Sequence, residues 1–181
     1  MYGLVNQAIE DLVRTQHGGS VWEQIKEKAD VQIEAFIGME QYPDDVTYRI
    51  VEAASQVLEI DCDAIFRAFG EHWVLYTAKK GYGEMLAACG RTLPQFLNNL
   101  DMLHTRVGVI MPHLKPPSFS CTDITPNSLH RHYYSHRQGL THMVVGLVQG
   151  LGKLLGTEAT IRQIGGRHTG GDHDVFYVSW K

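Results

Sequence analysis

Apolar residues recur at steps of three and four through most of the first two-thirds of the chain. That spacing places them on one face of a helix and is typical of helices that pack against a core. Ser20 and Glu23 form a capping box that predicts a helix start, and Asp61 or Asp63 is expected to cap another helix. The predicted helices cover residues 2–16, 20–29, 44–58, 61–74, 81–89 and 92–110.

After Pro116 and Pro117 the pattern changes to the alternation that is typical of half-buried strands. Strands are predicted over residues 118–123, 128–135, 157–164 and 175–180, with one further helix over 137–155. Helices followed by strands indicate an α+β fold. We therefore expect the helical N-terminal two-thirds to pack on a C-terminal antiparallel sheet that carries one helix. No repeat or linker interrupts residues 1–181, so a single domain is expected.

Composition narrows the possible functions. A net charge of −4 over 181 residues gives no basic footprint for nucleic acid. No apolar run is long enough to span a membrane, and the amino terminus lacks the basic start of a signal peptide. Three widely spaced cysteines form no disulfide framework, so we expect a cytoplasmic protein. The ten histidines are numerous for this length and prompt a search for metal chemistry.

The helix predicted over 92–110 carries one histidine on its apolar face. Leu97 and Leu100 lie seven and four residues before His104, so all three side chains are expected to point the same way. A buried histidine is most often a core residue that hydrogen-bonds to a backbone carbonyl. Neutral imidazole in an apolar pocket is also a common axial ligand of a heme iron. This helix alone leaves both interpretations open.

The predicted strand 128–135 leads into the sequence Tyr-Tyr-Ser-His-Arg. Alternation places Tyr133, Ser135 and Arg137 on one face. Two hydroxyl groups and a guanidinium can bind two neighbouring carboxylates, such as the propionates of a heme. A solvated sheet face is the alternative interpretation of the same trio.

Together these residues resemble one protein family. His104 on a helix, Pro117 downstream and the Tyr-x-Ser-x-Arg motif at 133–137 resemble the H-NOX domain. This is the heme–nitric oxide/oxygen binding family of bacterial sensors and of the soluble guanylate cyclase β subunit. The stretches MYGLVNQAIEDLV, FGEHW and GGDHDVF also look familial, so the resemblance covers essentially the whole chain.

The resemblance implies a cofactor and its contacts. Heme b, protoporphyrin IX iron, would lie between the helical part and the sheet. His104 would be its axial ligand, Pro117 would press on the porphyrin, and the Tyr-x-Ser-x-Arg residues would hold the propionates. The remaining expected contacts are Val5, Trp73, Met143 and Leu100.

The resemblance also implies a function without catalysis. Ferrous heme would bind nitric oxide and carbon monoxide. The domain would signal to a separate partner protein, such as a histidine kinase or a diguanylate cyclase. Oxygen-binding members carry a distal tyrosine on the helix after the motif, whereas this sequence has His142 near that place. His142 could donate to bound oxygen, which would make the protein an oxygen-binding H-NOX, but we expect it to face solvent.

Two other functions are compatible with the residues. A heme enzyme of the peroxidase type would need a distal acid–base group, and His142 alone offers itself. A zinc or nickel site could use His130, His132 and His136, which share the face of the strand opposite to the motif. We expect instead that these three histidines form the exposed polar face of a half-buried strand.

Overall fold

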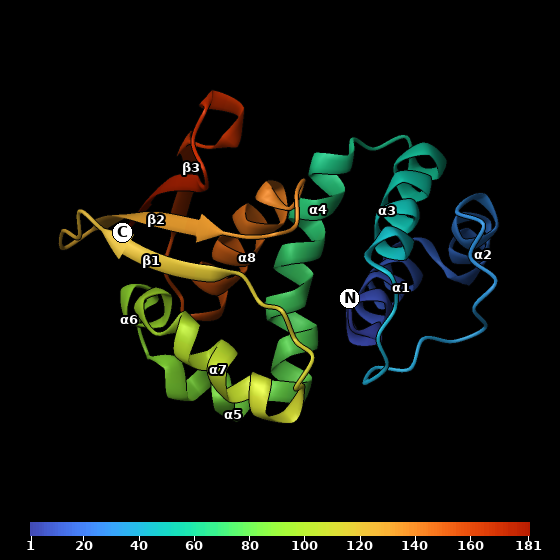
Figure 1. The fold of residues 1–181 in the computed structure, drawn as a ribbon, viewed down its shortest axis with the longest axis horizontal. Helices are drawn as coiled ribbons and strands as arrows, with labels where there is room; N and C mark the ends of the chain where they lie inside the picture. Colours follow the sequence, from blue (N-terminus) through green and yellow to red (C-terminus); the bar gives the residue numbers. More distant parts are fainter.

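The computed structural model describes the backbone of residues 1–181 and the side chains of all but residues 77–80 and 168. A helical part comes first, and a four-stranded sheet follows it (Figure 1). The helices are α1 Gly3–His17, α2 Gly19–Lys28, α3 Asp44–Leu58, α4 Cys62–His72, the π-helix η1 Trp73–Ala78, α5 Lys79–Cys89, α6 Leu93–Asn98, α7 Leu100–Ile110, α8 Thr141–Leu154 and the 3₁₀ helix η2 Arg167–Thr169. The strands are β1 Ser118–Thr122, β2 Ser128–Tyr134, β3 Ala159–Gly165 and β4 Asp174–Trp180. The predicted α+β class is confirmed.

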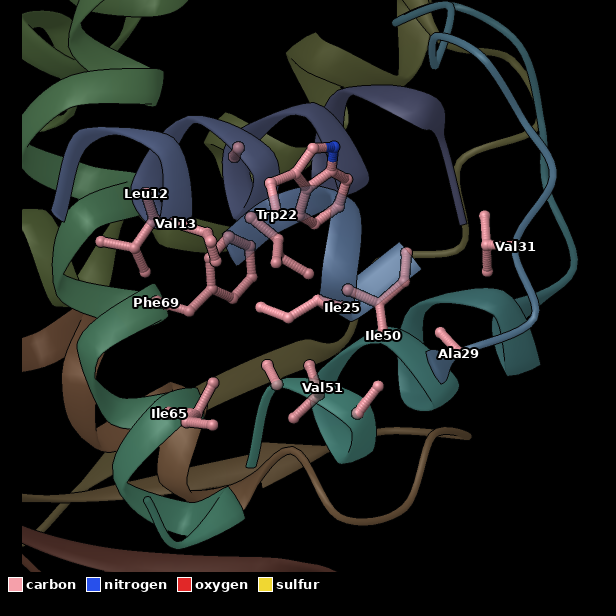
Figure 2. Close-up of a cluster of buried hydrophobic side chains, with 14 of the residues drawn as sticks. Leu12, Val13, Trp22, Ile25, Ala29, Val31, Ile50, Val51, Ile65 and Phe69 are labelled. Carbon is pink, nitrogen blue, oxygen red and sulfur yellow. The ribbon is translucent and has the colours of Figure 1, made fainter. Parts of the chain in front are cut away.

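One apolar core lies among α1, α2, α3 and α4 (Figure 2). Its side chains come from the stripes that the sequence pattern predicts, such as Ile9, Ile50 and Phe69. Trp22 of α2 lies among them and is only 1% exposed. Burial of one large apolar side chain contributes about 1.5–3 kcal/mol, so this cluster holds the first helices together as a unit.

A second apolar core joins the inner face of the sheet to α6, α7 and α8. Leu129 and Phe176 of the sheet and Leu93 of α6 are at most 1% exposed in it. Trp73 is half-buried and packs against both cores. It therefore marks the boundary between the helical part and the sheet part.

Glycines let α8 cross α4 at very short range. A Cβ atom at Gly146 would lie 2.0 Å from the carbonyl oxygen of Arg67, and one at Gly70 would lie 2.3 Å from that of Met143. Ordinary carbon–oxygen contacts are well above 3 Å. The two helices therefore touch backbone to backbone, and this contact ties the helical part to the sheet part.

The predicted helix 92–110 is broken in two. Thr92 caps α6 and Pro94 lies in its first turn, as predicted. Asn99 then leaves helical geometry, with φ −99° and ψ 5°, and its side chain donates to the Cys89 carbonyl oxygen at 2.8 Å. His104 belongs to α7, which starts afresh at Leu100. The spacing argument from Leu97 to His104 was therefore wrong, because the two residues lie on different helices.

The strands pair antiparallel in the order β1-β2-β4-β3. Along β2, burial alternates so that Leu129, Arg131 and Tyr133 face the core, and a solvated face on the Tyr133 side of the strand is excluded. The helix expected to start at residue 137 begins only at Thr141. Gly139 has φ +76°, outside the helical region, so the end of the motif lies in a loop.

Other helix limits also differ from expectation. Trp73, expected in the fourth helix, opens the π-helix η1, which continues α4 into α5. Ser20 lies inside α2, and no side chain caps that helix, so the predicted capping box was wrong. Asp61 caps α4 as one of the two predicted candidates, because its carboxylate accepts from the backbone N–H of Asp63 at 2.8 Å. Among the described residues, no helix has the length and apolarity needed to cross a membrane.

Candidate functional site

His104 lies mid-way along α7 with a partly buried imidazole. Burial is the main cause that lowers its pKa below the ordinary value. Asp101 opposes this shift and the charge of Arg131 adds to it. The imidazole is therefore neutral at neutral pH, which is the form that binds metals. Its Nδ1 atom is buried and lacks a hydrogen-bond partner. This unpartnered nitrogen leaves one ring position of His104 free to bind a metal.

Helix α7 is joined to strand β1 by the carboxylate of Asp101. Asp101 accepts a hydrogen bond from the backbone N–H of Phe119 at 2.9 Å and from the Ser118 hydroxyl at 3.1 Å. The Phe119 ring stacks on the His104 imidazole, with centroids 5.8 Å apart, and contacts the Tyr133 ring at 5.3 Å. One aromatic ring thus connects the candidate ligand with the motif on β2.

Tyr133, Ser135 and Arg137 line one cavity of about 260 Å³. Tyr133 is the last inward-facing residue of β2, and the other two follow in the loop before α8. Burial raises the pKa of the Tyr133 phenol, so it stays protonated and can donate a hydrogen bond. The remaining lining residues are Gln138, Gly139, Leu140, Thr141, Arg167 and Asp174. The structure therefore brings the predicted trio together, with a second guanidinium beside it.

Arg137 also bridges the two parts of the molecule. Its Nε donates to the Asp44 carboxylate at 2.7 Å and its Nη1 to the Lys115 carbonyl oxygen at 2.8 Å. The amino group of Met1 binds the same carboxylate. Burial by itself raises the pKa of Asp44, but the hydrogen bonds and charges of the N-terminus and Arg137 outweigh it and hold that pKa below its usual range.

The other predicted contacts are distributed over both cores. Val5 and Met143 pack against the helical core, Leu100 packs against the sheet core, and Trp73 packs against both. Pro117 is half-buried, and its main chain lies beside the His104 imidazole, where it acts to raise the pKa of that group. A group placed between His104 and Trp73 would therefore lie at the junction of the two cores.

His142 is directed to the start of α4. Its Nε2 lies 3.1 Å from the Asp63 carboxylate, and its Nδ1 lies 3.2 Å from Nη2 of Arg67. Both ring nitrogens therefore have partners on that helix. His142 was expected to face solvent, whereas its side chain is 35% exposed and packs against α4.

The alternative prediction of a zinc or nickel site formed by His130, His132 and His136 was wrong. His130 pairs with Asp123 at 2.8 Å, and His132 contacts His173, with 2.8 Å between their nitrogens. His136 lies beyond the end of β2 and is exposed. Among the described residues, no group of three histidine, cysteine, aspartate or glutamate side chains could hold a metal ion. The outer face of the sheet instead carries a chain of hydrogen bonds, in which Thr122 joins His132 to Asp123.

Sequence reasoning missed three charged residues near the site. Asp44 was interpreted only as a helix start, and its partner Arg137 is 93 positions away. Arg167 donates to the Ser135 carbonyl oxygen from a glycine-rich loop. Arg131 is 2% exposed. Arg131 lies two residues before Tyr133 on β2, so alternation places both on the same face. That pattern could have indicated a buried guanidinium.

The sequence matches the family model described as Haem-NO-binding over residues 2–163. The chain belongs to this family, the H-NOX domains. Two relatives from Caenorhabditis elegans are the soluble guanylate cyclases gcy-31 and gcy-35, which are 30% identical over 169 residues and 33% identical over 153 residues. The matches cover 93% and 82% of this chain but 24% and 22% of those proteins. The chain thus spans about a quarter of the length of these relatives.

Solved H-NOX structures share the fold. One from S. oneidensis in the Fe(II)NO ligation state has a TM-score of 0.90 at 21% identity and covers 100% of this chain and 99% of that one. The Fe(II) unliganded protein from K. algicida has a TM-score of 0.85 at 20% identity and covers 100% and 97%. The helical part, the sheet and their order along the chain are therefore those of the H-NOX fold.

H-NOX domains bind heme and act as gas-sensing, non-catalytic domains. The residues of this chain fit such a group. His104 offers an imidazole with a buried, orphaned nitrogen, and the cavity beside Tyr133 offers hydroxyl and guanidinium donors that suit carboxylates.

Proposed function

We propose that this H-NOX domain senses nitric oxide and carbon monoxide through a ferrous heme b held by His104. The observation that supports this proposal is the buried, unpartnered ring nitrogen of His104, on a helix linked through Phe119 to the motif strand. When bound, heme would supply a ferrous iron with an open position for a diatomic gas. The sequence has no Cys-x-x-Cys-His motif, so the attachment is non-covalent, as heme b requires.

The motif residues hold the carboxylate edge of the group. The protonated Tyr133 phenol and the Ser135 hydroxyl donate hydrogen bonds, and Arg137 supplies the charge. Because Arg137 also binds Asp44, the propionates and the first helices share one guanidinium. Apolar walls that exclude water would come from Pro117 and from Leu100, Val5, Trp73 and Met143, which pack against the two cores.

Selectivity against oxygen follows from the lack of a tyrosine donor on α8. Bound oxygen needs a hydrogen-bond donor, whereas nitric oxide and carbon monoxide bind without one. The α8 sequence contains no tyrosine, and His142 contacts Asp63 and Arg67 instead of the pocket. The same arrangement leaves a peroxidase without its acid–base group.

Contacts that join the helical part to the sheet part would carry the effect of gas binding away from the heme. Asp101 and Phe119 couple α7 to β1, and Arg137 couples the motif loop to α3. A gas that weakens the bond between His104 and the heme iron would allow α7 to move. That movement would shift the equilibrium between two relative positions of the helical part and the sheet part. We propose that a separate histidine kinase or diguanylate cyclase reads this shift, in line with the resemblance to bacterial sensors.

Replacement of the ligand tests the proposal. His104→Gly should purify with little heme and should regain it when imidazole is added, because free imidazole fits the space that the side chain leaves. His136→Gly is the matched control, since His136 is exposed at the end of the motif strand and should leave heme content unchanged. If His104→Gly retained full heme with an unchanged Soret band, the assignment of the ligand would be wrong.

A further inference from the structure

Arg131 is a charged residue in the interior of the sheet core. It is 2% exposed and lies on the inner face of β2 between Leu129 and Tyr133. Arginine is rarely buried unless a carboxylate pairs with it. None of the ion pairs formed by the described side chains includes Arg131. The burial of this charge therefore has no salt bridge to explain it.

The guanidinium is held in place by neutral groups. Its Nη1 donates to the Leu97 carbonyl oxygen at 2.6 Å and to Sγ of Cys121 at 3.0 Å. Its Cζ lies 4.4 Å from the centre of the Phe119 ring, and its Nη2 is buried without a partner. Arginine stays protonated in proteins, so these contacts fix the position of a positive charge without neutralising it.

This charge lies close to the candidate iron ligand. Phe119, which contacts the guanidinium, also stacks on the His104 imidazole. Asp101, on the same helix as His104, acts on Arg131 from beyond ion-pair contact. In the low dielectric of a protein interior, a fixed charge acts over several ångströms more strongly than it would in water.

We propose that Arg131 is a positioning residue that fixes a positive charge beside the heme site and thereby favours ferrous over ferric iron. The inference rests on the proposed function, because it requires heme at His104. Oxidation of the iron removes one electron, which an external acceptor takes up, and adds one positive charge to the site. A buried cation raises the free energy of that product and so makes oxidation harder. Ferrous iron is the state in which the proposed sensor binds its gases.

The test is a redox titration of the heme-loaded protein with mediator dyes. Arg131→Met and Arg131→Gln remove the charge, and Gln keeps a donor for the Leu97 carbonyl oxygen. Arg131→Lys keeps the charge. Arg162→Met is the matched control, because Arg162 is exposed on β3. We expect more negative midpoint potentials and faster oxidation in air for the two neutral variants. Arg131→Lys and Arg162→Met should stay near the wild-type value.

Each other outcome is decisive. A neutral variant that loads heme and titrates at the wild-type potential overturns the proposal, because the guanidinium would then be structural only. The same conclusion holds if both neutral variants fold, by circular dichroism, but take up no heme. If the wild-type protein itself takes up no heme, the proposed function fails instead, so the two failures can be told apart.

Discussion

The close crossing of α4 and α8 gives a sharp prediction about stability. In Gly146→Ala the new methyl group would lie 2.0 Å from the Arg67 carbonyl oxygen, which belongs to a helix backbone and cannot swing aside. To reach ordinary contact, the helices must separate by roughly an ångström or more. Such overpacking costs about 1–3 kcal/mol. The same substitution in an open helix position is favourable by about 0.5–1 kcal/mol.

Thermal unfolding followed by circular dichroism measures this cost. A loss of about 2 kcal/mol lowers the Tm of a domain of this size by about 4–8 °C. Gly81→Ala is the control, because a Cβ atom at Gly81 in α5 meets nothing within 4 Å, and its Tm should be unchanged or slightly raised. Because the crossing sets the spacing between Trp73 and Met143, Gly146→Ala should also retain less heme. If Gly146→Ala melted at or above the control, the two helices would not be in backbone contact.

Three further predictions concern charged and titratable groups. Arg137→Ala should purify with less heme than Arg162→Ala, measured by the ratio of Soret to protein absorbance, and equal ratios would count against the propionate site. The folded-state pKa of Asp44 is lowered, so its stabilising contribution is complete above the unfolded pKa of about 4 and is lost as the pH falls through the folded value. Because the Asp44 side chain is 39% exposed, Asp44→Asn should lower the free energy of unfolding by only about 0.5 kcal/mol at pH 7. It should also weaken the loss of that free energy at low pH in urea unfolding, whereas an unchanged pH profile would refute the stabilising role of the Asp44–Arg137 ion pair. His142→Ala should leave the absorption spectra of the carbon monoxide and nitric oxide complexes unchanged, and an altered spectrum would place the imidazole in the pocket.

The sequence predicts well those helices and strands that depend only on a local pattern, either an apolar helix face or alternating apolar and polar residues. The strands β1 and β2 match within a residue at either end, and alternation alone places Tyr133 on the face of β2 opposite to His130 and His132. The cap of α4 by Asp61 is likewise local, since its partner is the backbone two residues on. Such features need no knowledge of the rest of the fold.

Features that depend on distant contacts do not follow from those patterns. The break at Asn99 is stabilised by the Cys89 carbonyl, ten residues away, and the apolar period runs through it without a signal. The pairing of Asp44 with Arg137 spans 93 positions. The inward face of β2 was predictable at residue 131, but the partners that accept a guanidinium there come from α6 and β1. In each case tertiary contacts decide, and a single sequence does not display them.

The absorption spectrum of the reduced, heme-loaded protein tests the account most directly. In air-saturated buffer we predict the spectrum of unligated ferrous heme, because α8 carries no tyrosine and His142 contacts Asp63 and Arg67. Addition of nitric oxide should then change the spectrum at once, and the change should be absent from His104→Gly without imidazole, which should hold little heme. A stable oxygen complex in air, or a protein that takes up no heme at all, would contradict the account.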